Sequence, residues 1–600
     1  MRQFFSCAWL LCGGTLCLAQ TAEEMFPLKP ADIHALIRET APKIEEKFKG
    51  THAEADGLVE RVSEALALTT PPQPDEGDRG RRLAKAMHLM NADVLFAKCT
   101  NDGIRGPVSD TSTAGCMQRY RELEAATARD AGEVWRWLEM QEAARYLKWT
   151  DQKKICGERA LGAARALIAR EPKNAAAHAL LALALDWGAD KLAALQTALR
   201  LDARQPLAAH TLLDHRVELA FAAAVLRRDI ALAEPEPEDV ERALFDRPLA
   251  EDERLAFEKL QDELRREAEP LLALAEQRGD LTVYLKTLSL LAGLRRQADK
   301  IALAAKRGPE DRYEVFQARQ SALLLPWLAT TFEDTRRLRT ALALTRDDPE
   351  AMGTIFIITM LGEVSRLMMA GQQAAPERQE LLEQTLAALV ARAAADDSVP
   401  AARAAEAVVA AEFTRMMAGR PPQHLDLLLR AIRLDPLRFR AHGTLLAMCM
   451  MKPEPDLAAS SAILQIQLAM LPNFDTRRMC AAASASLHDW PAAHRYLDAC
   501  LKEKPDDVLL LNQRAATWLR ESQSKSAQKK AAALFDKMAP LLQEQIGALS
   551  KSDRELLAKN RILFHALCGK NDEARAALAA ALENKSLDEK EGKALAPLLK

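Results

Sequence analysis

Histidine and cysteine are the residue types in this chain that could bind a metal or carry nucleophilic chemistry. Eleven histidines are present, and the closest pairs, His210 with His215 and His488 with His494, are five and six residues apart. Neither spacing places both rings on one helix face, as the spacing of four in zinc-binding helices does. The chain also contains no Cys-x-x-Cys, no glycine-rich phosphate loop and no Gly-x-Ser-x-Gly turn. We therefore expect no metal, no cofactor and no catalytic residue.

Two pairs of cysteines could form disulfides. Cys99 and Cys116 border residues 100–115, a stretch rich in Gly, Pro, Asn and Ser, which are turn residues. In an oxidising compartment a bridge there would stabilise the fold by about 3 kcal/mol on the chain-entropy model. The alternative is two unpaired thiols. We interpret Cys480 and Cys500, inside two expected helices, as buried small hydrophobic side chains rather than a disulfide.

The region 88–150 is the alternative location for chemistry. An enzyme site there would be assembled from His88, the loop between Cys99 and Cys116, and the tryptophans Trp135, Trp137 and Trp149. Aromatic residues at helical spacing most often pack in a core, so we expect core packing. An aromatic-lined ligand pocket is the alternative.

The first residues have the pattern of a secretory signal peptide. Arg2 precedes an apolar run from Phe4 to Leu18, and small residues suitable for cleavage follow. We expect residues 1–20 to be removed and the protein to be exported to the periplasm or cell envelope of a bacterium, or secreted. A lipoprotein is the alternative, because Cys12 and Cys17 lie within the run.

Composition points to a helical protein. Charged residues make up 28% and hydrophobic residues 49% of the 600, which is neither a disordered nor a membrane composition. Ala, Leu, Arg and Glu dominate, aromatics are 5%, and helix formers therefore prevail. Charge is nearly balanced and no later apolar stretch could span a bilayer, so we expect neither a nucleic-acid partner nor a membrane span in the mature chain.

Helical hairpins recur along the chain at a regular interval. Pro172 and Pro206 mark one such interval, and the stretch from Asn473 to Asp506 is a pair of helices of the same length, joined by a tight turn. With a period of about 34 residues, this stretch resembles the tetratricopeptide repeat. The resemblance rests on small residues at Ala481, Ala493 and Cys500, the closing Pro505, and a His488-Asp489-Trp490 turn in which His replaces the family's Gly. The run from Leu429 to Pro436 and the turn from Lys570 to Ala574 are similar to other parts of that repeat.

The resemblance implies an all-α fold, a right-handed α-solenoid of stacked antiparallel hairpins with an irregular N-terminal helical region. It is clearest over 405–587 and weaker over 135–206. The expected segments are a signal peptide (1–20), an N-terminal helical region (21–132), hairpins (133–232), divergent hairpins (233–404), an array (405–587) and a capping helix (588–600).

Individual helices can be predicted outside the clearest repeats. We expect helices at Ala31–Phe48, kinked at Pro42, at Ala53–Leu68, and from Met117 to Trp149. In the less regular middle of the chain we expect further helices, among them 281–305 and 376–395. Thr354 to Thr359 has strand propensity, but its neighbours are helical, so we interpret it as part of a buried helix.

The resemblance also implies a binding surface. In the family, an early position of each first helix faces the concave surface, and here Arg478, Asn512 and Lys559 occupy it, with Arg440 nearby. This polar and basic strip could bind a peptide carboxylate or an acidic segment. The alternative is ordinary solvated charge. We expect a non-enzymatic scaffold for protein or peptide partners; an enzyme at 88–150 and a self-assembling structural component are the other hypotheses.

Overall fold

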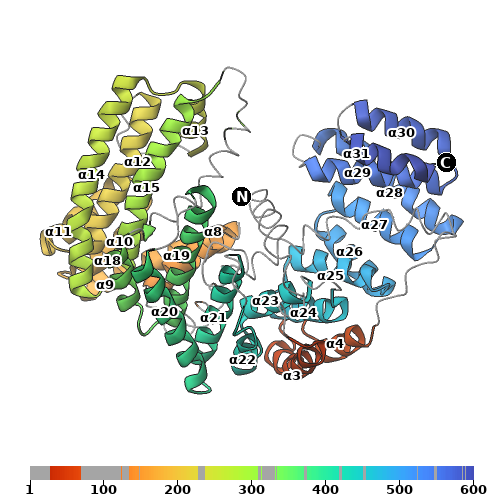
Figure 1. The fold of residues 1–600 in the computed structure, drawn as a ribbon, viewed down its shortest axis with the longest axis horizontal. Helices are drawn as coiled ribbons and strands as arrows, with labels where there is room; N and C mark the ends of the chain where they lie inside the picture. The colour runs from red at the N-terminus through yellow and green to blue at the C-terminus, as the bar shows by residue number, and fades with distance from the viewer. Residues whose placement is uncertain are drawn as a thin grey trace. The chain divides into compact units, whose positions relative to one another are not determined.

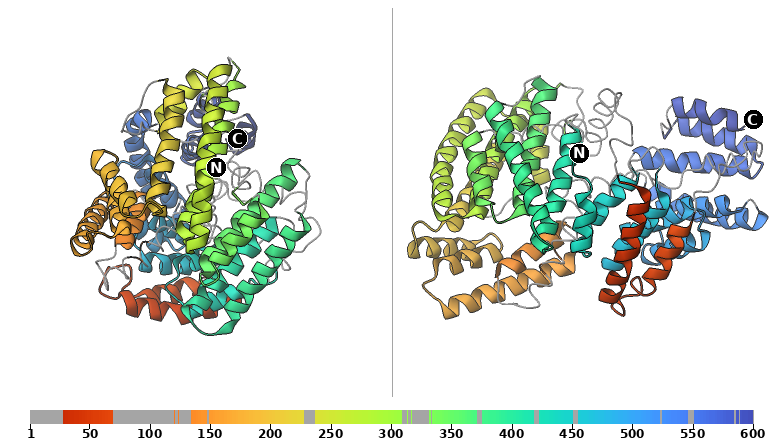
Figure 2. Two further views of the ribbon diagram at one scale, coloured as in Figure 1. Left: turned by 90° about the vertical axis from the view of Figure 1, so that its left-hand side faces the viewer. Right: turned by 60° about the horizontal axis from the view of Figure 1, so that its bottom comes forward.

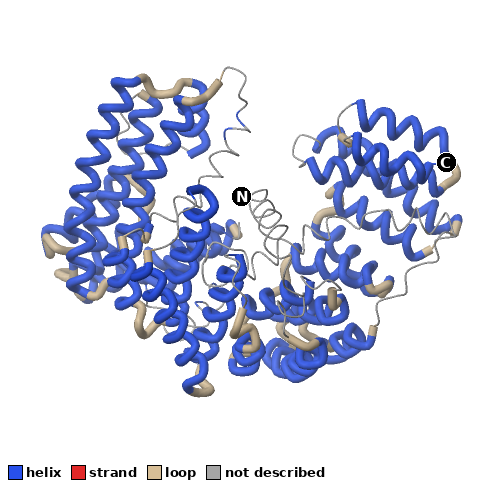
Figure 3. Tube along the Cα trace, viewed as in Figure 1, coloured by secondary structure: helices blue, strands red, loops and turns tan. Residues whose placement is uncertain are grey.

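The computed structural model describes most of the chain from residue 28 onward. The described residues are 28–68, 120, 123, 134–146, 149–227, 237–308, 313, 316, 331–332, 334–370, 375–417, 422–450, 455–522, 524–545, 551–583, 586–587 and 589–599. Within these ranges every regular element is a helix (Figure 3). The predicted all-α fold class is therefore confirmed.

The described residues fall into two compact units. The central unit contains the described residues from 120 to 435, and the C-terminal unit combines residues 28–68 with those from 436 to 599. Each unit is described by itself below, with the helix labels of Figure 1. The first two described helices thus belong with the last third of the chain.

The central unit contains thirteen of the described helices. They are α8 (Val134–Tyr146), α9 (Thr150–Arg170), α10 (Ala175–Ala184), α11 (Ala189–Leu201), α12 (Pro206–Leu226), α13 (Pro237–Asp246), α14 (Glu251–Arg278), α15 (Leu281–Ala305), α18 (Thr335–Leu344), α19 (Pro349–Ala370), α20 (Pro376–Ala395), α21 (Val399–Met417) and α22 (Leu427–Leu434).

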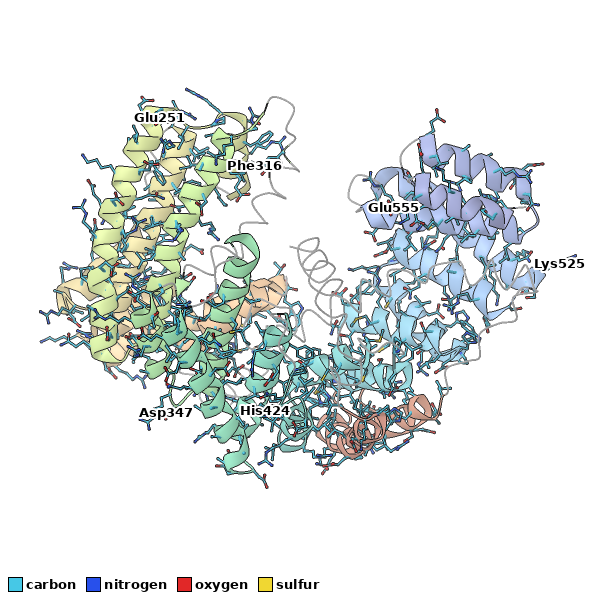
Figure 4. All side chains as sticks on the ribbon, in the orientation of Figure 1. Glu251, Phe316, Asp347, His424, Lys525 and Glu555 are labelled. Carbon is cyan, nitrogen blue, oxygen red and sulfur yellow. The ribbon has the colours of Figure 1, made fainter. Side chains whose placement is uncertain are left out.

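Neighbouring helices of the central unit pack in antiparallel pairs, α8 with α9 and α10 with α11, while α12, α14 and α15 form a longer bundle. Phe316, labelled in Figure 4, packs on Phe245 in an aromatic cluster of this unit. The segment Thr354–Thr359 lies inside α19, and Ile355, Phe356 and Ile357 are buried, so the predicted buried helix is confirmed. The expected helix ending at Trp149 is shorter, because α8 ends at Tyr146 and Trp149 precedes α9.

The C-terminal unit contains eleven described helices and a short 3-10 helix. They are α3 (Pro30–Phe48), α4 (Leu58–Ala67), α23 (Phe439–Met450), α24 (Leu457–Met470), α25 (Phe474–Ser486), α26 (Trp490–Glu503), α27 (Val508–Glu521), α28 (Lys525–Gln545), α29 (Lys551–Leu567), α30 (Asn571–Glu583), α31 (Glu589–Leu595) and η4 (Ala596–Leu599).

From α23 onward the helices form consecutive hairpins, α23 with α24, α25 with α26, α27 with α28 and α29 with α30. The segment α31–η4 packs against the last of them, and Leu595 and Leu599 close its apolar end. A terminal hairpin needs such a cover, because it has no further neighbour to bury its second face.

The hairpin α25–α26 shows why this sequence folds locally as two helices. Asn473 caps α25 by accepting a hydrogen bond from the Thr476 amide (2.9 Å), and Asp489 caps α26 by accepting one from Ala492 (3.1 Å). Between them His488 turns the chain with φ +60°, in the left-handed region.

Ala493 supplies the first testable prediction. It is fully buried between α25 and α26, beside Ala485 and Trp490. Ala493→Leu should overpack this contact and lower stability by about 1–3 kcal/mol, measured by chemical denaturation. Ala499→Leu is the matched control, because Ala499 is exposed on the same helix. Equal stability of the two variants would contradict the repeat interpretation.

One predicted boundary is wrong. The expected helix at Ala53–Leu68 begins only at Leu58, because Gly57 adopts φ +68° and ends any helical path through it. The Glu45 carboxylate, on α3, accepts a hydrogen bond from the Val59 amide (2.7 Å). This bond satisfies one of the backbone N–H groups in the first turn of α4, which have no partner within their own helix. Pro42 lies inside α3 as predicted.

Candidate functional site

The predicted strip is distributed over four successive first helices of the hairpins. Arg440 lies on α23, Arg478 on α25, Asn512 on α27 and Lys559 on α29. Arg440 and Asn512 are buried, at 1% and 0% exposure, whereas Arg478 and Lys559 are half-buried. Arg478 and Lys559 are therefore the members of the strip whose side chains are partly open to a partner.

Asn512 joins two of the hairpins directly. Its Oδ1 accepts a hydrogen bond from Nδ2 of Asn560 on α29 (3.3 Å), and Asn560 is the sequence neighbour of Lys559. Among the described residues, Asn512 Nδ2 and both amide atoms of the adjacent Gln513 have no hydrogen-bond partner, although both residues are 0% exposed. Each such buried group costs about 1–3 kcal/mol, so α27 holds hydrogen-bonding capacity that its own packing does not use.

The two reachable cations differ in their surroundings. Lys559 Nζ lies 2.6 Å from the Glu591 carboxylate of α31, so the capping segment holds it in place. Burial lowers the pKa of Arg478, although the carboxylates of Asp507, Asp475 and Asp553 act in the opposite direction. The local field at Arg478 is therefore mixed rather than purely basic.

The N-terminal hairpin α3–α4 packs on α24 in this unit, a contact that sequence reasoning missed (Figure 2, right). Asp456 caps α24 through Ala459, and its second oxygen lies 2.9 Å from His34 Nε2 on α3. Arg477 on α25 pairs with Glu54 (2.7 Å), in the loop before α4, and with Glu503 (3.2 Å). Two polar contacts between the beginning and the last third of the chain therefore accompany the packing of α3 and α4 on α24.

A signal for this contact is present in α24 itself. Its sequence, LAASSAILQIQLAM, includes no charged side chain, and every residue from Ala459 to Met470 is buried. By contrast α26 places Arg495, Asp498 and Lys502 on an exposed face. A second helix of a hairpin that lacks a charged outer face requires another element to cover it.

The two cysteines of the hairpin α25–α26 are buried thiols. Cys480 and Cys500 are both free and buried, and burial raises the pKa of Cys480 and raises that of Cys500 to about 12. Such thiols stay protonated and are poor nucleophiles. The interpretation of these two residues as small hydrophobic side chains is confirmed.

The region 88–150 is described only in part. The predicted signal peptide, His88, Cys99, Cys116 and the loop 100–115 lie outside the described residues, so the signal peptide and the disulfide stay predictions. Trp137 is buried in a cluster with Met140 and Cys156, and Trp149 packs edge-on against Tyr120 with ring centroids 5.1 Å apart. Core packing accounts for these rings.

Two further properties belong to the described part of the chain. No group of three or more His, Cys, Asp or Glu side chains in it could hold a metal ion. In the same ranges, no helix is both long and apolar enough to cross a membrane.

Comparisons with known proteins add little to this geometry. No family model matches the chain, and no curated protein matches it. A search of solved structures finds the tetratricopeptide-repeat (TPR) domain of P58(IPK), at 14% sequence identity and a TM-score of 0.15 over 72% of this chain and 98% of that chain. At this TM-score the alignment carries no weight, and the hairpin assignment rests on the helix contacts described above.

Proposed function

We propose that the protein is an exported, non-enzymatic scaffold whose C-terminal unit binds an acidic protein segment or a peptide carboxylate. The observation that supports this is the row of polar and basic side chains on the first helices of successive hairpins, of which Arg478 and Lys559 are reachable. A rigid stack of hairpins presents such groups at fixed spacing, so little conformational entropy is lost on binding.

The surrounding residues assign a separate role to each member of the strip. Arg478 and Lys559 would supply charge-assisted hydrogen bonds to carboxylates. Asn512, through Asn560, would fix the distance between the hairpins that carry them. Arg440, at 1% exposure, would act in packing rather than in contact with the partner.

Charge reversal tests this proposal. The variant Arg478→Glu, Lys559→Glu and Glu591→Lys removes both cations while it restores an ion pair between α29 and the cap. We expect it to weaken binding of a labelled acidic peptide by about tenfold or more, measured by fluorescence anisotropy, because each lost charged hydrogen bond is worth roughly 1.5–3 kcal/mol.

The control for this test is Arg495→Glu with Lys502→Glu, two exposed cations on the second helix α26. This control lowers the net charge by four, whereas the strip variant lowers it by two because Glu591→Lys offsets one reversal, and it leaves the strip intact. An amidated peptide in which Gln and Asn replace the acids is the ligand control. Equal affinity of the strip variant and this control variant would contradict the proposal. Proteins that the immobilised wild type retains from envelope extract, and that the strip variant does not, are the candidate partners.

A further inference from the structure

The edge at which α25 and α27 end carries a second group of side chains, independent of the strip. It consists of His488 and Trp490, in the turn between α25 and α26, and Arg520, in the last turn of α27. Lys525, labelled in Figure 4, begins α28 at this same edge. The His488 ring stacks on Trp490 with centroids 5.0 Å apart and an interplanar angle of 22°. The Arg520 guanidinium lies 5.9 Å from the Trp490 ring centroid.

Arg520 is a half-buried cation without a carboxylate. Among the described residues no carboxylate or carbonyl accepts a hydrogen bond from it, and its stacking on Trp490 leaves the five guanidinium N–H donors unused. Burial lowers the pKa of Arg520 to about 10, and the same charge helps to lower the pKa of His488. A cation removed from water is normally paired, so this part of the fold lacks a counter-ion.

Two neighbouring basic side chains on these helices already have carboxylate partners. Arg514 lies 2.8 Å from Asp498, and His494 lies 2.8 Å from Glu521. Asp489 is also engaged, because it caps α26. These three carboxylates near the edge thus bind other groups, and none of them forms an ion pair with Arg520.

The backbone at His488 is a further feature of this group. Its φ of +60° lies in the left-handed region, which Gly569, at φ +75°, occupies in the turn between α29 and α30. Glycine or asparagine adopts this conformation more readily than histidine. The backbone conformation of the turn therefore does not explain why residue 488 is a histidine. The contact of its ring with Trp490, next to Arg520, offers an explanation.

We propose that His488, Trp490 and Arg520 form a binding site for a small oxyanion such as phosphate. The guanidinium offers two parallel N–H donors to two oxygens of the anion. The imidazole, which stacks on the Trp490 ring, offers a third donor. Phosphate and carboxylate groups both present oxygens that can accept these hydrogen bonds, and the experiment below distinguishes the two.

Isothermal titration calorimetry on the full chain tests the site, with inorganic phosphate or acetate added at constant ionic strength in chloride. We expect phosphate to bind, and more tightly than acetate because of its higher charge. Arg520→Gln should weaken phosphate binding by about tenfold or more, and His488→Asn, which suits the left-handed turn, should weaken it by less. Arg495→Gln, at an exposed arginine of α26, should leave it unchanged.

Arg520→Lys serves if the glutamine variant does not fold. It retains the charge but not the paired donors, so phosphate binding should fall while stability is kept. No phosphate-dependent heat in the wild type would overturn the proposal. Equal phosphate affinities for wild type and the folded Arg520 variants would overturn it as well, because Arg520 would then have only a structural role. Tighter binding of acetate would assign the site to a carboxylate ligand.

Discussion

Leu36→Ala should lower the free energy of unfolding of the C-terminal unit by about 2–5 kcal/mol. Leu36 is 1% exposed on the buried face of α3, together with Ile33 and Ile37, and α3 packs against both α4 and α24. Truncation leaves a cavity in a contact that joins the beginning of the chain to its last third. The loss should appear beyond the hairpin itself, because among the described helices α3 and α4 are the ones outside the array that cover α24.

Hydrogen exchange in increasing denaturant, read peptide by peptide, measures this effect. Protection should fall in α24 and α25 as well as in α3 and α4. Lys47→Ala is the control, since Lys47 is exposed on the same helix, and it should change stability by less than about 0.5 kcal/mol. A loss confined to peptides of α3 and α4 would show that the hairpin is only an appendage of the array.

Local structure in this protein could be predicted from sequence because helix signals are local. The predicted helix at 281–305 agrees with α15, which begins directly after its capping residue Asp280. The predicted helix at 376–395 agrees with α20, which Pro376 begins. The capping segment after residue 587 and the hairpins on either side of Asn473–Asp506 follow from the same periodicity and turn residues.

The position of the first hairpin could not be predicted in the same way. Nothing near Ile33 or Leu36 states that their partner is a helix in the last third of the chain, because an amphipathic face is complementary to any apolar surface. The lack of charge in α24 indicates that something covers it, without saying what. The ion pair between Arg477 and Glu54 identifies the partner, and it is visible only in three dimensions.

The sequence predicted which helices carry the strip residues, but not which of their side chains are exposed. The strip residues lie on the first helices as the repeat pattern implies, and their role in binding stays a prediction. Periodicity gives the direction of a side chain from its own helix, whereas exposure depends on neighbouring helices. This is why Arg440 and Asn512 are buried beside reachable residues of the same repeat position.

Acid should destabilise both units between about pH 7 and pH 4.5, before most carboxylates titrate. His210, in the central unit, is 5% exposed, and His442, in the C-terminal unit, is 1% exposed. Burial lowers the pKa of each to about 4 from an ordinary value of 6.5. In this interval the unfolded chain binds a proton at each histidine and the folded chain does not. Stability therefore falls as pH falls.

The expected loss at pH 4.5 is about 2–3 kcal/mol for each buried histidine. Carboxylates with lowered pKa values, such as Glu54 and Glu253, work in the same direction but act only near and below their ordinary pKa of 4.5. In the upper part of this pH interval, the change in stability therefore comes from the histidines. Urea unfolding at each pH, followed by pulsed hydrogen labelling at one fixed pH, reads the two units separately.

His442→Gln assigns the effect to one side chain. His442 Nε2 lies 2.9 Å from the Pro436 carbonyl oxygen, so it carries the proton and donates, and a glutamine amide can replace this hydrogen bond. In this variant the C-terminal unit should lose its dependence on pH above 5, apart from smaller contributions of the exposed His488 and the half-buried His494 and His565, whose pKa values partial burial also lowers. The central unit should keep the dependence that His210 gives it. An unchanged pH dependence in the C-terminal unit would show that His442 becomes protonated without unfolding, and that the packing around α23 admits a charge.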